Sequence, residues 1–208
     1  MHFIGNEVFV FNSKPVSFSP PFFSAAISPI AGCAKETDLR NAWQIRNISV
    51  WVIHGAKDKT ININCSYEAV KHIKSNGGSP KFTVYQDVGH DLEEIWGNTL
   101  YNDEWYTWML NQNRKNNLPK YIQPKKSILK EYYGQYSMDG NTLSITMENE
   151  HLQVSLGKGR TRKMQAESNT VFSFEKSSFI GLRFIKTVDS VTGFEMLPQT
   201  EKKASKIN

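Results

Sequence analysis

The stretch Val50-Trp51-Val52-Ile53-His54-Gly55-Ala56-Lys57-Asp58 decides the fold class of the first half of the chain. It completes an almost entirely apolar run over residues 48–53, as expected of a parallel strand that is buried on both faces. His54 and Gly55 end the run, and Asp58 follows in a polar segment. The stretch therefore predicts a central strand with an acidic side chain just beyond its carboxyl end.

Apolar runs and helical patterns alternate on both sides of this strand. Residues 25–30 and 82–85 predict two further strands, and apolar residues three and four positions apart predict a helix over 65–75. A second helix is predicted over 103–113, where the apolar residues again fall on one face. This alternation is typical of a parallel sheet with crossover helices.

The spacing of apolar residues changes to two in the second half of the chain. Leu143, Ile145 and Met147 alternate with polar residues, and later segments repeat the pattern between turn residues such as Asp139 and Gly140. This pattern predicts an antiparallel meander of six or seven strands that closes as a barrel or a strongly curved sheet.

The two patterns divide the chain into segments. We predict an α/β domain over 23–113, a polar and proline-punctuated linker over 114–127, a small antiparallel β-barrel over 128–200 and a frayed tail over 201–208. Residues 1–22 fit neither pattern, because their short apolar patch is followed by three prolines. The predicted fold class is therefore α/β followed by all-β.

Composition and charge exclude several classes of protein. The 208 residues are 39% apolar and 12% aromatic, which is too rich in packing side chains for a disordered chain. No apolar run reaches the roughly 18 residues that a membrane helix needs. Residues 1–114 carry 10 cations against 11 acids, and the remaining residues carry 15 against 9. The excess cations are scattered without a ladder of aromatic residues, so we predict no nucleic-acid binding. The short apolar runs likewise predict no membrane span.

The two cysteines are too few for a disulfide framework or a cysteine-rich metal site. Cys33 and Cys65 are isolated in the sequence and form no C-x-x-C pair. We interpret both as small buried side chains in preference to a bridge or a reactive thiol.

Asp58 and His90 are the candidate catalytic residues. His90 follows the strand predicted over 82–85, and carboxyl ends of neighbouring parallel strands lie side by side, so the two residues should meet although they are 32 positions apart. An aspartate that accepts the imidazole N–H of a histidine supplies two members of a nucleophilic triad. Taken singly, each residue has a simpler interpretation, Asp58 as an Asx turn and His90 as a loop residue.

The acidic residues beside His90 raise the alternative of a metal site. Asp91, Glu93 and Glu94 follow His90, but no second histidine lies three or four positions further on. We therefore interpret this segment as a solvated acidic loop, and the sequence predicts neither a metal nor an organic cofactor.

Four segments carry a resemblance to a known family. They are residues 23–27, 50–58, 85–91 and 105–110. In order and spacing they resemble the carboxyl-terminal part of an α/β-hydrolase of the dienelactone hydrolase, carboxylesterase or prolyl oligopeptidase-like kind. The resemblance implies the last three strands of the hydrolase sheet, Asp58 as the triad acid and His90 as the triad base. It also implies an ester or peptide substrate cleaved through an acyl-serine, with His54 supporting the loop.

The nucleophile of that family is missing from this sequence. The family places its serine in a G-x-S-x-G turn, and no such motif occurs in these 208 residues. Residues 1–22 offer only Ser13, Ser17 and Ser19, none of them between glycines. We therefore expect a truncated serine hydrolase that is inactive alone, with an open apolar edge at the strand over 25–30. A complementing hydrolase fragment is a candidate partner.

The second half has a resemblance of its own. Residues 129–136, which include the pattern Tyr132-Tyr133-Gly134-Gln135-Tyr136, resemble a small β-barrel of unknown function that is appended to secreted hydrolases. That resemblance implies no catalytic residues in the barrel. It supports an alternative in which the chain is a non-catalytic binding module and the barrel is its working part. No credible signal peptide is recognised, and the compartment stays open.

Overall fold

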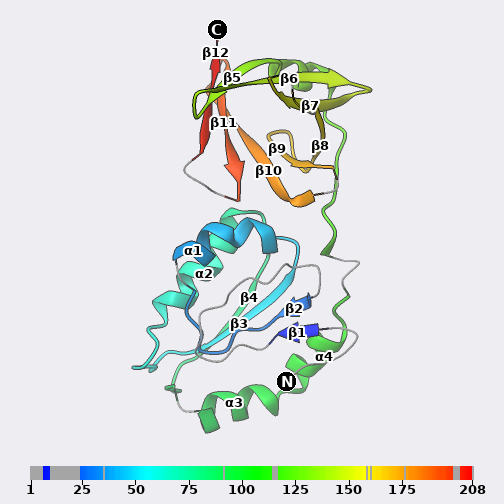
Figure 1. Ribbon diagram of the computed structural model, residues 1–208. Helices are drawn as coiled ribbons and strands as arrows, with labels where there is room; N and C mark the ends of the chain where they lie inside the picture. Colours follow the sequence, from blue (N-terminus) through cyan, green and yellow to red (C-terminus); the bar gives the residue numbers. More distant parts are fainter. Residues whose placement is uncertain are drawn as a thin grey trace. The chain divides into compact units, whose positions relative to one another are not determined.

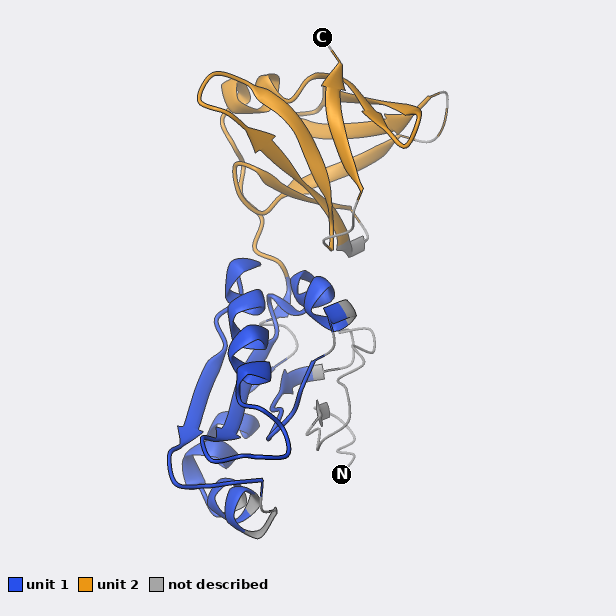
Figure 2. Cartoon of the chain, turned by 90° about the vertical axis from the view of Figure 1, so that its left-hand side faces the viewer, with its two compact units in different colours: residues 1–118 blue, residues 119–208 orange. Residues whose placement is uncertain are grey.

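The computed structural model describes the chain with short gaps, and it divides into two compact units, residues 1–118 and 119–208 (Figures 1 and 2). The described residues are 7–9, 24–34, 36–90, 92–113, 117–157, 159, 161–175, 177–198 and 202–207. Within these ranges, the helices all fall short of the length and apolarity needed to cross a bilayer.

The first unit is built from one parallel sheet and helices. Its elements in chain order are β1 (Glu7–Phe9), β2 (Ser24–Ile27), α1 (Glu36–Arg40), the 3-10 helix η2 (Asn41–Ile45), β3 (Ser49–Gly55), α2 (Asn64–Ser75), β4 (Lys81–Tyr85), α3 (Leu92–Leu100) and α4 (Asp103–Leu110). The strand order is β1-β2-β3-β4, and every pairing is parallel. The parallel sheet with crossover helices is confirmed, whereas α1, η2 and α3 were not predicted.

Alternate residues of β3 enter two separate apolar clusters. Val50 and Val52 pack with residues of η2 and α2, including Ile73, on one face of the sheet. Trp51 and Ile53 pack with residues of α3 and α4 on the other face. All four β3 side chains are buried, and burial of each contributes about 1.5–3 kcal/mol. This two-sided burial explains the unbroken apolar run in the sequence.

β1 corrects the prediction of an open sheet edge at the strand over 25–30. Glu7 pairs with Ser24, and Phe9 pairs with Ile27, so β2 has neighbours on both sides. The sequence did not reveal β1 because three residues are too short to show a period. The rest of residues 1–22 lies outside the described residues, and so do Ser13, Ser17 and Ser19.

A disulfide overturns the interpretation of the two cysteines. Cys33, in the loop after β2, is bonded to Cys65 in the first turn of α2, with their Cα atoms 4.9 Å apart. The bridge closes a separation of 32 residues, which corresponds to about 3–4 kcal/mol of stabilisation through the unfolded state. Only the packing of α2 beside the end of β2 brings the two side chains together, so their positions in the sequence did not reveal the bond.

The second unit is a closed antiparallel barrel with one short helix. Its elements are α5 (Lys126–Glu131), β5 (Gly134–Met138), β6 (Asn141–Glu148), β7 (His151–Leu156), β8 (Arg162–Ala166), β9 (Val171–Phe174), β10 (Ser177–Lys186), β11 (Val191–Leu197) and β12 (Lys203–Ile207). Neighbouring strands pair in sequence order, and β12 pairs with β5 to close the barrel. The predicted barrel is confirmed, although it has eight strands where six or seven were expected.

The frayed tail predicted over 201–208 is wrong for Lys203–Ile207. This segment forms β12 and pairs with both β11 and β5. Ala204 is buried while its neighbours Lys203 and Ser205 are not, and the other apolar residue of the strand, Ile207, is exposed. Such a pattern carries too little hydrophobic alternation to predict a strand.

Aromatic side chains fill the barrel interior. Tyr132 stacks on Phe184 at 3.9 Å between ring centroids, and Phe172 and Phe194 pack edge-on against Phe184. The Tyr136 hydroxyl donates to the carbonyl of Tyr132 at 2.8 Å, which satisfies a buried polar group. Burial raises the pKa of both tyrosines. The centre of the barrel is therefore a packed core.

Candidate active site

Asp58 lies in the loop after β3 and its side chain is fully buried. One carboxylate oxygen, Oδ1, accepts hydrogen bonds from the backbone N–H groups of Thr60 at 2.9 Å and Ile61 at 2.8 Å. These bonds make the Asx turn that is the simpler interpretation of this residue. They leave the second oxygen, Oδ2, available for other donors.

His90 reaches that second oxygen from the loop after β4. Its Nδ1 lies 2.8 Å from Asp58 Oδ2. Because a carboxylate only accepts, Nδ1 carries the proton, and Nε2 is the nitrogen that can accept one. The His90 side chain is 22% exposed, and no side chain or backbone group among the described residues hydrogen-bonds Nε2. The ring is therefore partly open to solvent, and Nε2 keeps its lone pair for a proton.

The ends of β3 and β4 hold the two loops together. Gly55 is paired with Tyr85, and beyond it the N–H of Lys57 donates to the carbonyl of Val88 at 2.9 Å. A Cβ atom on Gly55 would lie 2.4 Å from that Val88 carbonyl oxygen, which is closer than real Cβ contacts come. The parallel register and the missing side chain at Gly55 together bring Asp58 to His90.

His54, near the end of β3, contacts the loop that carries Asp58. The ring is fully buried, and its Nε2 lies 3.0 Å from the Ile61 carbonyl oxygen and 3.3 Å from Asp58 Oδ2. Its Nδ1 lies 2.7 Å from Ser66 Oγ in the first turn of α2. Ser66 did not emerge from the sequence, because a serine near a helix start has too many ordinary explanations.

Burial and hydrogen bonding act in opposite directions on Asp58. Desolvation raises the pKa of its carboxyl group, but the backbone N–H of Ile61, the His90 ring and the backbone N–H of Thr60 together lower it by more. The net pKa lies below the usual value for an aspartate, so the carboxylate stays ionised at neutral pH. An ionised Asp58 can stabilise a positive charge on His90.

The described part of the chain does not offer a metal-binding site. There, no three His, Cys, Asp or Glu side chains are gathered as a metal site requires. Asp91 lies outside the described residues, and the side chain of Glu93 is also not described. Glu94, in α3, is exposed.

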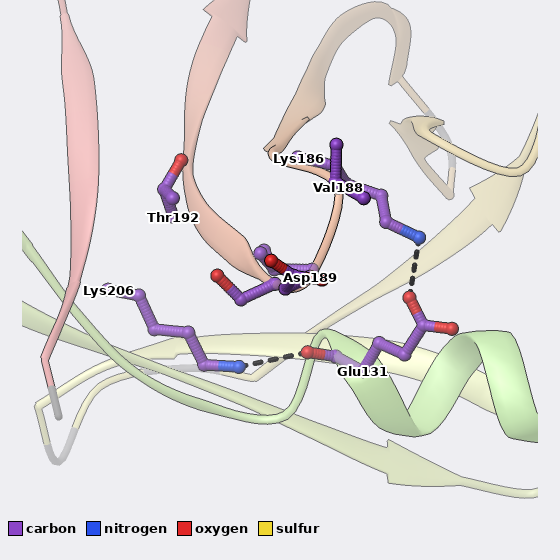
Figure 3. A pocket seen from close by; sticks show the side chains of 8 residues that line it. Glu131, Lys186, Val188, Asp189, Thr192 and Lys206 are labelled. Atoms are coloured by element: carbon purple, nitrogen blue, oxygen red, sulfur yellow. Dashed lines mark hydrogen bonds and ion pairs between the residues drawn. The ribbon is translucent and has the colours of Figure 1, made fainter.

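The barrel has a cavity of about 660 Å³ at one end (Figure 3). Lys186 on β10 donates to the carboxylate of Glu131, and Lys206 on β12 donates to the backbone carbonyl of Glu131 at 2.9 Å. Asp189 and Thr192 also line this space. The sequence did not indicate it, because these residues gather only when the barrel closes.

Comparison with known proteins gives partial likenesses only. No family model and no curated protein matches the sequence. Two solved structures are similar in part. A thermostable esterase is 26% identical, with a TM-score of 0.36 over 43% of this chain and 25% of that one. Acyl-protein thioesterase 2 of Zea mays is 18% identical, with a TM-score of 0.35 over 42% of each chain. The chain thus spans less than half the length of either hydrolase.

Proposed function

We propose that this chain carries the acid and the base of a serine hydrolase site that cleaves ester or peptide bonds. The observation that carries the proposal is the 2.8 Å hydrogen bond from His90 Nδ1 to the buried Asp58 carboxylate. It leaves Nε2 as the accepting nitrogen, which is the one that must receive a proton from a serine hydroxyl.

The residues have these roles in the proposed reaction. As the serine oxygen attacks the carbonyl carbon, its proton moves to His90 Nε2, and Asp58 stabilises the resulting imidazolium. His90 then gives that proton to the leaving alcohol or amine, which breaks the substrate bond and leaves an acyl-serine. A water molecule, activated by His90 in the same way, releases the acid and restores the serine.

The serine comes from outside this sequence in our proposal. No G-x-S-x-G occurs in the 208 residues, although the segments over 50–58 and 85–91 resemble those of dienelactone hydrolases, carboxylesterases and prolyl oligopeptidases. We infer that this chain is a truncated form with no acyl-serine activity of its own. A further polypeptide segment, in the same chain or a second one, completes the site.

Complementation tests this proposal directly. The chain is co-expressed with an esterase fragment that ends after its G-x-S-x-G turn, and hydrolysis of p-nitrophenyl acetate is measured for the purified pair. We expect turnover from the pair and none from either polypeptide alone. His90→Ala and Asp58→Asn in this chain should each remove the gain, whereas Asp87→Asn, on an exposed ion pair with Lys57, should leave it unchanged.

Two results would contradict the proposal. A folded, serine-containing pair that shows no turnover would exclude a complementing role for this chain. Turnover that survives His90→Ala would exclude His90 as the base. The nucleotide sequence upstream of the Met1 codon, read in all frames for further strands and a G-x-S-x-G, distinguishes a separated segment of one gene from a second polypeptide.

The cavity in the barrel favours a second candidate function, that of a binding module. A lysine ammonium has three N–H donors, and Lys186 and Lys206 each use one on Glu131, so donors remain for a ligand. Asp189, also at the cavity, has no partner among the described residues. Figure 3 shows its side chain in the space between Lys206 and Lys186. We infer a small ligand that carries both a carboxylate and an amine, such as an amino acid.

An NMR titration tests the binding module. Glycine should shift the amide signals of residues 186–192 and 206 more strongly than acetate or methylamine at the same concentration. Lys206→Gln and Asp189→Asn should each weaken the effect, and Lys202→Gln, outside the cavity, serves as the control. Equal shifts from all three small molecules would reject a site for a zwitterion.

A further inference from the structure

We infer that Ser66, held in place beside the Cys33–Cys65 disulfide, is a positioning residue for the Asp58–His90 pair and acts through His54. The inference rests on the proposed function, because the pair it concerns is the proposed acid and base. Neither the segment over 50–58 nor the contact between Asp58 and His90 assigns a role to Ser66 or to the Cys33–Cys65 disulfide.

A continuous chain of buried contacts links Ser66 to His90. Ser66 is 2% exposed, and its Oγ lies 2.7 Å from His54 Nδ1. His54 Nε2 reaches Asp58 Oδ2 at 3.3 Å and the Ile61 carbonyl at 3.0 Å. The same Asp58 oxygen accepts the 2.8 Å hydrogen bond from His90. Of the side chains that form these contacts, His90 alone is partly open to solvent.

The partners of His54 fix which of its nitrogens carries the proton. The Ile61 carbonyl and the Asp58 carboxylate can only accept, so His54 Nε2 must donate. Nδ1, on the opposite side of the ring, lies within hydrogen-bond distance of the Ser66 hydroxyl. The acceptors at Nε2 thus set the tautomer, and the Ser66 hydroxyl, which can donate or accept, holds the other side of the ring. Without that hydroxyl, the ring loses its polar contact at Nδ1 and is held through Nε2 alone.

The disulfide fixes the position of Ser66. Cys65 precedes Ser66 in the first turn of α2 and is bonded to Cys33, in the loop that follows β2. The N-terminal turn of α2 is thus tied covalently to the loop after β2. Beside the bridge, Asn62 Oδ1 accepts a hydrogen bond from the backbone N–H of Asn64 at 2.9 Å, so a side-chain contact also holds the start of α2.

Substitution of Ser66 tests the inference in the chain as it exists. The readout is the proton on His90 Nδ1, whose hydrogen bond to a carboxylate gives an NMR resonance at low field and slow exchange with water. His90→Gln identifies this resonance by its loss. In Ser66→Ala, we expect the resonance to exchange with water about 10-fold faster or to disappear.

Ser66→Thr is the matched variant that keeps the hydroxyl. Ser66 and Ala69 line part of a cavity of about 40 Å³, so the chain around Ser66 is not completely filled. We therefore expect the threonine variant to retain the slow exchange of the wild-type protein. The amide signals of the barrel and the tryptophan fluorescence of the first unit show in each variant that the chain is folded.

Reduction tests the role of the disulfide. A dithiol reagent transfers two electrons and two protons to Cys33–Cys65, which yields two thiols, while the reagent closes its own disulfide. The resonance should then exchange faster, as in Ser66→Ala, and the Cys33→Ala/Cys65→Ala variant should reproduce this in the absence of reagent. No further change should follow when reagent is added to that variant.

The outcomes separate this inference from the proposed function. Exchange at the wild-type rate in a folded Ser66→Ala would overturn the positioning role, and loss of stability without a change in the resonance would show a purely structural serine. An unchanged resonance after reduction would overturn the part assigned to the disulfide. None of these readouts depends on hydrolysis. They therefore test the positioning role of Ser66 even if complementation fails.

Discussion

Gly55 lies against the backbone of Val88 so closely that a Cβ atom at this position would be 2.4 Å from the Val88 carbonyl oxygen. This contact joins the end of β3 to the loop after β4, and the loops that carry Asp58 and His90 begin on either side of it. The geometry of the candidate site therefore depends on the absence of one side chain.

Gly55→Ala should separate the two loops. The added carbon meets backbone atoms, which cannot rotate away, so we expect a loss of about 2–3 kcal/mol or more in the stability of the first unit. Urea unfolding followed by tryptophan fluorescence measures it, because all five tryptophans lie in residues 1–118. Gly97→Ala is the control, since Gly97 lies in α3 with nothing within 4 Å of a built Cβ. It should be neutral or stabilising by up to about 1 kcal/mol, and equal losses in both variants would contradict the prediction.

Asp58 should contribute stability that depends on pH. Its pKa in the folded chain is held below the ordinary value for an aspartate, so the contribution is complete above that ordinary value and is lost as the pH falls through the folded pKa. Asp58→Asn should cost about 1.5–3 kcal/mol near neutral pH, because it removes charge-assisted hydrogen bonds.

The difference between Asp58→Asn and the wild-type protein should shrink on acidification from about pH 6 to about pH 3. Urea unfolding of the first unit at both pH values measures it. Asp87→Asn, in the exposed pair with Lys57, should change stability by less than about 1 kcal/mol at either pH. A difference for Asp58→Asn that stays constant with pH would show that ionisation of Asp58 does not stabilise the fold.

Loss of the disulfide should destabilise the first unit alone. Replacing Cys33 and Cys65 by serine removes a bridge over 32 residues, and we expect a cost of about 3–4 kcal/mol. Tryptophan fluorescence reports that loss, while hydrogen exchange of the barrel amides should stay at the wild-type rates. Unfolding at the wild-type urea concentration would mean that the bridge adds no stability.

Phe184→Ala should destabilise the barrel. Phe184 is 3% exposed and contacts Tyr132, Tyr136, Phe172 and Phe194, so its removal opens a cavity among four rings. We expect a loss of about 3–5 kcal/mol in barrel stability, measured by hydrogen exchange of the strand amides. The neighbouring Ile185→Ala, at a position 38% exposed, should cost much less. Similar losses at both positions would show that the ring cluster is not the centre of the core.

Much of the first unit could be predicted because its strands are buried on both faces. An apolar run such as that of β3 marks a parallel strand, and neighbouring strand ends in such a sheet must meet. The proximity of Asp58 and His90 was predictable for this reason, as the 2.8 Å hydrogen bond confirms. Their catalytic role stays a prediction until complementation tests it.

Elements with weak alternation could not be predicted from the residues alone. β1 is three residues long, and β12 buries a single alanine while its isoleucine is exposed. Both are strands because a neighbour pairs with their backbone, and backbone hydrogen bonds leave no trace in the order of side chains.

The sequence by itself determined the strands over 25–30, 48–53 and 82–85, the parallel sheet, the barrel and the loops on which Asp58 and His90 lie. Only the tertiary structure decided the Cys33–Cys65 bond and the contact of Ser66 with His54. The physical reason is that hydrophobic periodicity is a local property that each segment carries. A disulfide or a buried hydrogen bond instead requires two segments to pack at one distance and orientation, which the whole fold sets.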